Sequence, residues 1–290
     1  MSLAHGALLD ALRGATWPAR HAARGASTGS HRSVLRGTSP EFTEYRAYRQ
    51  GDDPRRIDWR LLARTDRAHL RITSDHSTLR TVIVVDASAS MAFPTATRTK
   101  WEQACRIAVG LAAVAHASGD PVGLIAVGDG APRSVPPRTR RGVAADIARL
   151  LTALVPNGTM PLAPAVAPLP ARTRVAIVTD FLGDADALLV AARARLRAGG
   201  DVCAVHLVAR LELEPPGSTM LAFDPEAPRT VRPLGADTRD DYARAFAEWR
   251  ARLGRDWREI GAGFTEVLDD EPAGHAVRRV IAPAASGVGR

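Results

Sequence analysis

Cysteine, aromatic residues and long apolar runs are all scarce in this chain of 290 residues. It has two cysteines, Cys105 in a helical pattern and Cys203 in an expected strand, and both lie on apolar runs. Such cysteines are typical of buried free thiols in a reducing compartment. Aromatic residues make up 5% of the chain, so the core must be built mainly from valine, leucine, isoleucine and alanine.

No stretch of the sequence is suited to cross a membrane. The longest uncharged run, 150–171, is interrupted by Pro156, Pro161, Pro164, Pro168 and Pro170. A membrane-spanning helix would not tolerate so many prolines. The first residues lack the basic start of a secretory signal, and charged residues interrupt their apolar pattern. We therefore expect a soluble, cytoplasmic protein without a membrane span.

Acidic residues are outnumbered, and the net charge of +8 comes almost entirely from arginine. Within residues 1–40 the only acid is Asp10, and the arginines are Arg13, Arg20, Arg24, Arg32 and Arg36. A basic segment can attract nucleic acid, an anionic membrane or an acidic protein. Aromatic residues do not alternate with these arginines as a stacking platform for nucleic acid requires. We interpret residues 1–40 as a solvated basic arm.

Apolar strand and helix patterns alternate between residues 76 and 282. Helical spacing of apolar residues is found over 100–117, 141–154, 184–198 and 238–260. This alternation predicts a doubly wound, mostly parallel sheet with helices on both faces. Residues 131–136 are expected to form an edge strand, where prolines are tolerated. A proline-rich insertion at 211–236 is expected to form a hairpin in which LAFD pairs with RTVRPL.

One expected strand ends in a cluster of oxygen ligands. Residues 81–85 are an uncharged run of β-formers, and the sequence continues DASAS, with Asp86, Ser88 and Ser90 at alternate positions. A carboxylate and two hydroxyls on a short turn suit a hard cation such as Mg²⁺ better than zinc. A turn with a helix cap has a similar composition, so this loop alone leaves both interpretations open.

Two later segments carry matching residues. A second apolar strand, RVAIVTD, also ends in an aspartate, Asp180, and Thr159 stands in a Gly-Thr loop between the two strands. With the first loop they complete a set that resembles, in residue type and order, the metal-ion-dependent adhesion site of von Willebrand factor type A domains: Asp86, Ser88, Ser90, Thr159 and Asp180.

Residues 41–75 are rich in arginine, aspartate and aromatic residues around a Gly-Asp-Asp-Pro turn. The residues concerned are Arg46, Tyr48, Asp52, Asp53, Arg55, Asp58, Trp59 and Arg64. Arginine forks can hold the aspartates bidentately while the tryptophan covers the arginine stems, which would make a structural network packed on the main domain. Exposed arginine and tryptophan could instead anchor an interface. The composition favours the structural interpretation.

The run RAYRQGDDPRRIDWRLLAR resembles the hallmark of the family catalogued as domain of unknown function 58. In that family it precedes a von Willebrand factor A-like domain, and the resemblance continues to about residue 282. After the basic arm at 1–40, it implies the family segment at 41–75, the A-like domain at 76–282 and a tail at 283–290. The implied sheet has the strand order 3-2-1-4-5-6, with an N-terminal β-rich extension.

The resemblance also assigns roles to the metal-site residues. In the implied strand order, Asp86 and Asp180 end neighbouring strands, where two carboxylates repel each other unless a cation or proton intervenes. Ser88, Ser90 and Thr159 would contact Mg²⁺, Mn²⁺ or Ca²⁺ directly, and the two aspartates directly or through water. An acidic residue of a partner protein would fill the open coordination position.

The resemblance further implies a partner. Genes of relatives commonly lie beside MoxR-type AAA+ ATPases, which suggests a chaperone-like pair acting on client proteins. Many relatives carry membrane helices ahead of the family segment, and none is visible in this sequence. We expect a non-enzymatic, metal-dependent protein-interaction module.

Two alternative functions stay open. A metal-dependent phosphoesterase would need a positioned base or nucleophile. The eight histidines lie outside the metal loops, there is no Gly-x-Ser-x-Gly or P-loop motif, and DASAS lacks the second aspartate of haloacid dehalogenase phosphatases. Nucleic-acid binding is supported by the net charge alone.

Overall fold

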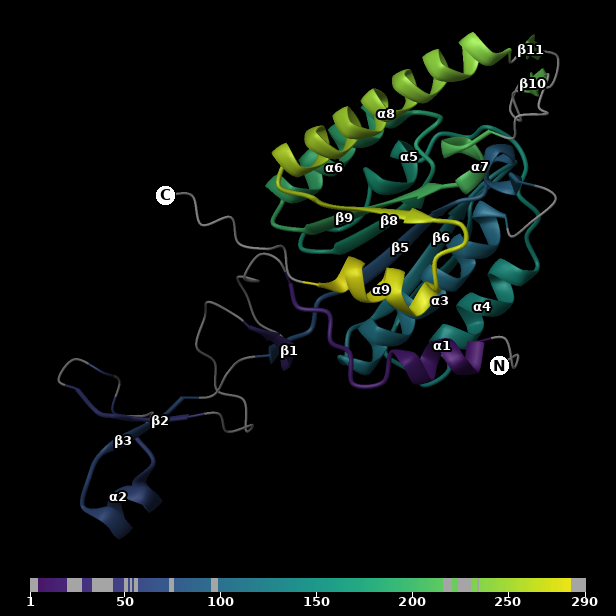
Figure 1. Cartoon of the computed structure of the whole chain (residues 1–290). Helices are drawn as coiled ribbons and strands as arrows, with labels where there is room; N and C mark the ends of the chain where they lie inside the picture. The colour runs from purple at the N-terminus through teal and green to yellow at the C-terminus, as the bar shows by residue number, and fades with distance from the viewer. Residues whose placement is uncertain are drawn as a thin grey trace.

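Six strands form one sheet at the centre of the protein, and helices cover both of its faces (Figure 1). The computed structural model describes residues 5–19, 28–32, 44–49, 52, 54, 57–72, 76–94, 99–215, 221–223, 231–233 and 235–282. The strands of this sheet are β5 (Thr81–Asp86), β6 (Val122–Val127), β7 (Arg133–Arg138), β8 (Arg174–Thr179), β9 (Asp201–Val208) and β12 (Gly263–Leu268). They lie in the order β12-β9-β8-β5-β6-β7, which reads 6-5-4-1-2-3 when they are numbered along the chain.

The pairing pattern explains the strand composition. All neighbours are parallel except β6 and β7, which are antiparallel. Every residue of β5, β8 and β9 is buried, as expected for central parallel strands covered on both faces. The exposed edge strand β7 carries Pro136 and Pro137, whose missing N–H groups are tolerated at an edge. The predicted doubly wound, mostly parallel sheet is confirmed.

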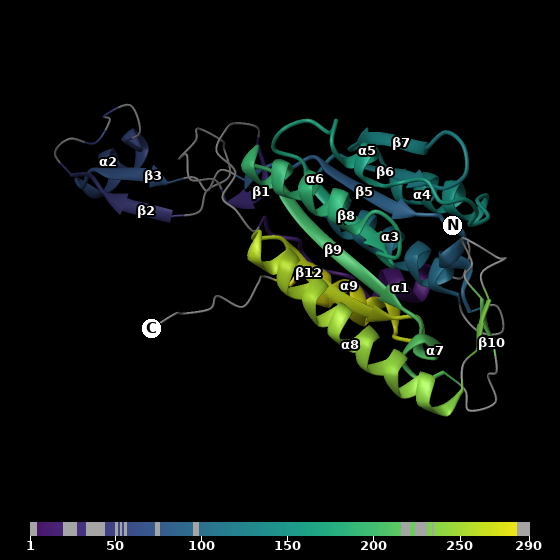
Figure 2. The same ribbon diagram turned by 90° about the horizontal axis from the view of Figure 1, so that it is seen from above.

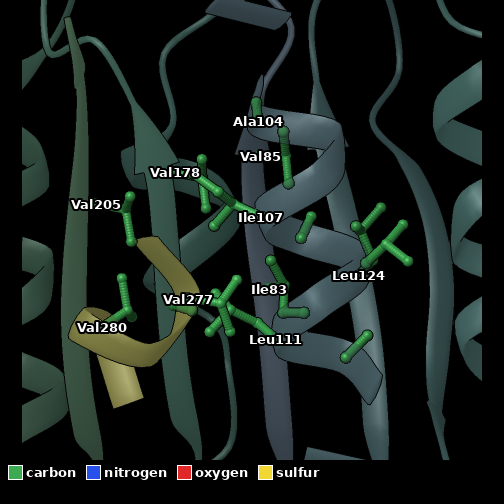
Figure 3. Packing of buried hydrophobic residues seen from close by; sticks show 14 of the residues in the cluster. Ile83, Val85, Ala104, Ile107, Leu111, Leu124, Val178, Val205, Val277 and Val280 are labelled. Carbon is green, nitrogen blue, oxygen red and sulfur yellow. The ribbon is translucent and has the colours of Figure 1, made fainter. Parts of the chain in front are cut away.

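One face of the sheet is covered by α1 (Gly6–Ala11), α3 (Lys100–Ala117), α4 (Val143–Thr152) and α9 (Ala273–Ile281). Figure 3 shows Ile107 and Leu111 of α3 lying against Ile83 and Val85 of β5, with Val277 of α9 beside them. These side chains are fully or almost fully buried. The core on this face is built from aliphatic side chains and alanine, as the low aromatic content predicts.

The other face is covered by α5 (Ala163–Val166), α6 (Ala185–Arg197) and α8 (Ala236–Glu259). Figure 2 looks down on this face and shows α6 and α8 running along the strands. Trp257 of α8 is fully buried and contacts the ring of Phe181 edge-on, at 5.3 Å between ring centroids. The predicted helices are found at 100–117, 143–152, 185–197 and 236–259, within a few residues of the expected bounds.

The N-terminal segment is part of the domain, so the expectation of a solvated arm over 1–40 does not hold for residues 5–19. Leu8, Leu12 and Trp17 are buried in the same core as α3 and α9. Gly110 of α3 allows this packing, because a Cβ atom there would lie 2.8 Å from Val277 and 3.1 Å from Leu12. Leu8 and Leu12 stand at helical spacing in the sequence, but the basic composition of residues 1–40 did not show that they pack on a glycine of α3.

A buried arginine joins the amino ends of the strands. Arg174, the first residue of β8, donates to Asp120 (3.2 Å), to Asp201 at the start of β9 (3.4 Å) and to the carbonyl oxygen of Trp17 (2.9 Å). Its guanidinium carbon lies 4.4 Å from the centroid of the Trp17 ring. The arginine side chain is fully buried, so its charge is compensated inside the protein.

Short elements complete the described chain. β1 (Thr28–Arg32) pairs with β4 (His76–Ser77), β2 (Glu44–Ala47) with β3 (His69–Ile72), and β10 (Leu221–Phe223) with β11 (Val231–Pro233), each pair antiparallel. The last pair confirms the predicted hairpin. The remaining helices are α2 (Trp59–Thr65), the 3-10 turn η3 (Ala89–Ala92) and α7 (Arg210–Leu213). The tail at 283–290 lies outside the described residues.

Cys203 is buried and Cys105 half-buried, both are free thiols, and burial raises the pKa of Cys105 to about 12. The prediction of free thiols on apolar runs is confirmed. Among the described helices, none combines the length and the apolar character needed to cross a bilayer.

Candidate metal centre

The two strand-ending aspartates reach the same edge of the sheet but point to opposite faces. β5 and β8 are parallel neighbours, with Val85 opposite Val178, so Asp86 has Thr179 beside it and Asp180 lies one residue further on. Because side chains alternate along a strand, Asp86 and Thr179 share the face of α5 and α6, whereas Asp180 is directed to the face of α3. The Thr179 hydroxyl donates to Asp86 Oδ2 at 2.5 Å.

The DASAS loop folds back onto its first aspartate. The backbone N–H of Ser88 donates to Asp86 Oδ1 at 2.8 Å. The hydroxyls of Ser88 and Ser90 lie 3.0 Å apart and share a hydrogen bond. All three residues are buried, with 6%, 5% and 1% of their surface exposed. The alternating spacing therefore gathers three oxygen-bearing side chains at one place, as the sequence predicts.

The loop that carries Thr159 is fixed against the DASAS loop by main-chain hydrogen bonds. Asn157 N–H donates to the Ala87 oxygen (2.8 Å), and Ala89 N–H donates to the Gly158 oxygen (3.0 Å). Gly158 has a φ of +80°, and a Cβ there would lie 2.9 Å from Asp129 Cα, so glycine is required in this contact. Thr159 itself is exposed, and it lines a pocket together with Asp86 and Ser88.

The environment of Asp86 disfavours the ionised form of its carboxyl group. Burial raises its pKa from 3.8 to about 6, the charge of Asp180 adds to the rise, and the hydrogen bonds from Thr179 and Ser88 oppose it. Removal from water and a nearby like charge both disfavour the ionised form. A bound cation would relieve both effects.

Asp180 is compensated by a residue that the sequence analysis missed. The ammonium group of Lys100, at the start of α3, donates to Asp180 Oδ2 at 2.8 Å and to Glu212 of α7 at 2.7 Å. The Lys100 side chain is 1% exposed, and the two acids raise its pKa against the opposing effect of burial. The other oxygen of Asp180 accepts from Leu182 N–H at 3.2 Å. Asp180 does not line the pocket that Asp86, Ser88 and Thr159 share.

The five expected ligands are therefore divided between two environments. Asp86, Ser88 and Thr159 line one pocket, and Ser90 is joined to it through the hydroxyl of Ser88. Asp180 belongs to a buried ion pair on the other face of the sheet. Within the described parts of the chain there is no group of three or more His, Cys, Asp and Glu side chains that could hold a metal. Three of the five expected ligands are the hydroxyl groups of Ser88, Ser90 and Thr159. A group of His, Cys, Asp and Glu side chains does not include them.

Sequence reasoning missed three residues of this region: Lys100, Glu212 and Thr179. One signal was available for Lys100, because a lysine in the first turn of a helix opposes the helix dipole. Thr179 could have been found from the expected pairing of the two strands, because alternation of side chains places it on the same face as Asp86. Nothing in the sequence pointed to Glu212, which lies 112 residues from Lys100.

The described hydrogen bonds of aspartates in the family segment come from main-chain N–H groups. Asp58 caps α2 by accepting from Arg60 N–H (3.1 Å) and Leu61 N–H (3.0 Å), and Asp52 accepts from Arg49 N–H (2.8 Å). Trp59 is 61% exposed. That it covers arginine stems stays a prediction, because Arg55 lies outside the described residues.

The remaining residues of the family segment are only partly described. Arg46 lies in β2, Tyr48 follows that strand half-buried, and Arg64 is exposed on α2. Asp53 and Arg55 lie outside the described residues. Packing of the segment 41–75 on the main domain stays a prediction.

Solved structures similar to this chain include the conserved hypothetical protein BatB from Bacteroides thetaiotaomicron, at 18% identity and a TM-score of 0.43, covering 70% of this chain and 97% of that one. The SpRpn10 VWA domain is similar at 11% identity and a TM-score of 0.39, covering 69% and 94%.

Sequence relatives are closer. Uncharacterized proteins of Mycobacterium bovis and Mycobacterium tuberculosis are each 32% identical over 259 residues, which is 83% of this chain and 78% of theirs. The family model described as "Protein of unknown function DUF58" matches residues 44–252. The chain is therefore a member of the DUF58 family.

Proposed function

We propose that this protein is a non-enzymatic, metal-dependent protein-interaction module. The observation that carries the proposal is the buried carboxyl group of Asp86 in a pocket that it shares with Ser88 and Thr159. Burial and the charge of Asp180 raise the pKa of this carboxyl to about 6. The ligand set resembles that of von Willebrand factor A-like domains, in which a bound metal ion coordinates an acidic residue of the partner protein. Family membership supports the same reading.

The residues present fit a hard divalent cation. Asp86, Ser88, Ser90 and Thr159 would hold Mg²⁺, or Mn²⁺ or Ca²⁺ in its place, because carboxylate and hydroxyl oxygens are the ligands these ions prefer. When bound, the ion supplies a coordination position that a carboxylate of another protein can occupy. Asp180, with its oxygens engaged by Lys100 and Leu182 N–H, adds negative charge beside the ion and keeps α3 in place.

The proposed partners are a MoxR-type AAA+ ATPase and a client protein that offers an acidic residue. The support is the family resemblance, in which the two genes commonly lie together. The two free cysteines fit a reducing compartment, which supports a cytoplasmic location. A phosphoesterase is not favoured, since among the described residues no histidine, lysine or arginine lines the pocket of Asp86 to act on a phosphate.

Isothermal titration calorimetry with the full chain tests the metal site. Wild type is expected to bind Mg²⁺, and Asp86→Ala to lose most of that affinity while keeping the circular dichroism spectrum and melting behaviour of a folded domain. Asp186→Ala is the matched control, because this acid is exposed on the first turn of α6 and does not line the pocket. An unchanged Mg²⁺ affinity in Asp86→Ala would refute the site.

Partner binding is tested with the same variants. A MoxR-type ATPase from the same genome is immobilised in the presence of Mg²⁺ and nucleotide, and retention of wild type, Asp86→Ala and Asp186→Ala is compared. Comparing variants at constant Mg²⁺ separates the metal of this chain from the metal that the ATPase itself needs. Equal retention of all three proteins would show that the pairing does not use the metal site.

A further inference from the structure

The pocket of Asp86 has a second, apolar end. Its volume is about 270 Å³, and Asp86, Ser88, Thr159 and Thr179 form one part of its lining. The apolar part of the lining is formed by Met160, Pro161, Leu162, Phe181, Ala185 and Leu188. The polar part holds three of the four residues assigned above to the metal, Asp86, Ser88 and Thr159, so a ligand of the metal would lie next to the apolar wall.

The apolar wall is held in place before any ligand arrives. Asp184, at the start of α6, accepts from Leu162 N–H at 3.2 Å and from Ala163 N–H at 3.0 Å, which ties the turn before α5 to α6. Phe181 has a φ of +59°, an uncommon conformation for a bulky residue. Its N–H donates to the Thr179 hydroxyl at 3.1 Å, and that hydroxyl donates to Asp86. The polar and apolar walls are therefore linked through one threonine.

The size of the pocket limits its occupant. Pockets for drug-sized ligands and cofactors have volumes of about 300–1,000 Å³, and this one is smaller. One side chain with its adjoining backbone fits into this space. Two large apolar side chains stand exposed beside the pocket, Met160 and Leu182, each with 48% of its surface in solvent. Exposed apolar side chains around a recess are typical of a protein-interaction site.

We propose that this pocket receives a large aliphatic side chain next to the carboxylate that the partner protein gives to the metal. The partner segment would then be an acidic residue adjoining leucine, isoleucine or methionine, with Met160 and Leu182 packing on its flanks. This inference rests on the proposed function, because the metal sets the position of the carboxylate. The metal alone would bind any accessible carboxylate, whereas the apolar pocket would select acidic segments that carry an adjoining aliphatic side chain.

The test uses three capped tetrapeptides as probes, Ac-Gly-Asp-Leu-Gly-NH₂, Ac-Gly-Asp-Gly-Gly-NH₂ and Ac-Gly-Asn-Leu-Gly-NH₂. Each is titrated into the full chain in Mg²⁺ and in EDTA, and the methyl NMR signals of Leu162 and Leu188 report occupation of the pocket. The Asp-Leu probe is expected to bind about ten- to a hundredfold more tightly than the Asp-Gly probe, the difference that burying a leucine side chain produces.

A variant that obstructs the pocket with a larger side chain tests its role. Gly183 lines the pocket mouth, and a Cβ there meets nothing within 4 Å, so Gly183→Leu places a side chain at the mouth without disturbing the fold. This variant is expected to lose the advantage of the Asp-Leu probe and to leave the Asp-Gly probe unchanged. Ala187→Leu is the matched control, since residue 187 is exposed on α6 and does not line this pocket.

The outcomes separate the pocket from the metal. Equal affinity of the two Asp probes, unchanged by Gly183→Leu, would overturn the pocket and leave the proposed function intact. Equal binding of the Asp-Leu and Asn-Leu probes, unaffected by EDTA, would overturn the metal-dependent function and with it the pocket's role. Failure of all probes to bind would overturn both. Tighter binding of 4-methylpentanoate than of the Asp-Leu probe would assign the pocket to a small aliphatic acid instead.

Discussion

Replacing Lys100 by methionine tests whether a buried ammonium group holds the acidic edge of the sheet together. Lys100, Asp180 and Glu212 are 1%, 2% and 15% exposed, and the ammonium lies 2.8 Å from one acid and 2.7 Å from the other. Methionine keeps most of the length of the side chain and removes the charge. Removing one partner of a buried ion pair costs about 3–5 kcal/mol, a large part of the roughly 5–15 kcal/mol that stabilises a typical domain.

The loss should fall in the upper half of that range at neutral pH, because two carboxylates lose the same partner. It should shrink as the pH is lowered, since uncompensated buried carboxyl groups take up protons. Urea denaturation of the full chain in EDTA, followed by circular dichroism, measures the free energy of unfolding. Mg²⁺ in excess should then stabilise Lys100→Met more than wild type, because the ion can replace part of the missing positive charge near Asp180.

The matched control is Arg13→Ala, which breaks the ion pair of Arg13 with Asp10, whose side chains are 83% and 71% exposed. Exposed pairs contribute under about 1 kcal/mol. If Lys100→Met costs no more than Arg13→Ala, the ammonium group does not hold this edge. If Mg²⁺ stabilises Lys100→Met less than wild type, the ion does not replace the positive charge that Lys100 supplies near Asp180.

Two further predictions concern the metal loops. Because the pKa of Asp86 is raised from 3.8 to about 6 in the folded state, its contribution to stability in EDTA is full below pH 4 and is lost as the pH rises through about 6, by about 3 kcal/mol in total. Asp86→Asn should flatten this part of the stability profile, measured by urea denaturation at several pH values, and an equally steep profile in the variant would refute the assignment. Gly158→Ala should lower both the melting temperature and the Mg²⁺ affinity, because the new Cβ meets Asp129 at 2.9 Å. Gly130→Ala is its control, since Gly130 has a similar φ of +74° with nothing within 4 Å, and equal losses in the two variants would attribute the effect to backbone strain alone.

The sheet and the position of the two aspartates at its strand ends were predictable because their signals are local. An uncharged run of β-formers followed by Asp86 or Asp180 marks a buried strand and its end, and the alternation of such runs with helical patterns determines the fold class. The charge partner of Asp180 was not predictable in the same way. Lys100 and Glu212 come from α3 and α7, and only the folded sheet brings them together. The direction in which Asp180 points depends on a register offset of one residue between β5 and β8.

The family segment shows a different limit. Aspartate can accept from an arginine fork or from a main-chain N–H group, and the composition of a segment does not distinguish the two. Asp58 accepts from two main-chain N–H groups and caps α2, which places Trp59 at the first position of an exposed helical turn. An N-cap reading of Asp58 was available from the sequence, because aspartate directly before a helical run is a common helix start.

The contacts of Arg174 at the amino ends of the strands limit how far the protein can be truncated. A fragment cut to the family match, 44–252, would lose Trp17, whose ring and carbonyl oxygen contact the Arg174 guanidinium. It would also lose β12, and the fully buried strand β9 would become an open edge able to pair with other molecules. Recombinant fragments meant for crystals or titrations should therefore begin ahead of Gly6 and run past Ile281.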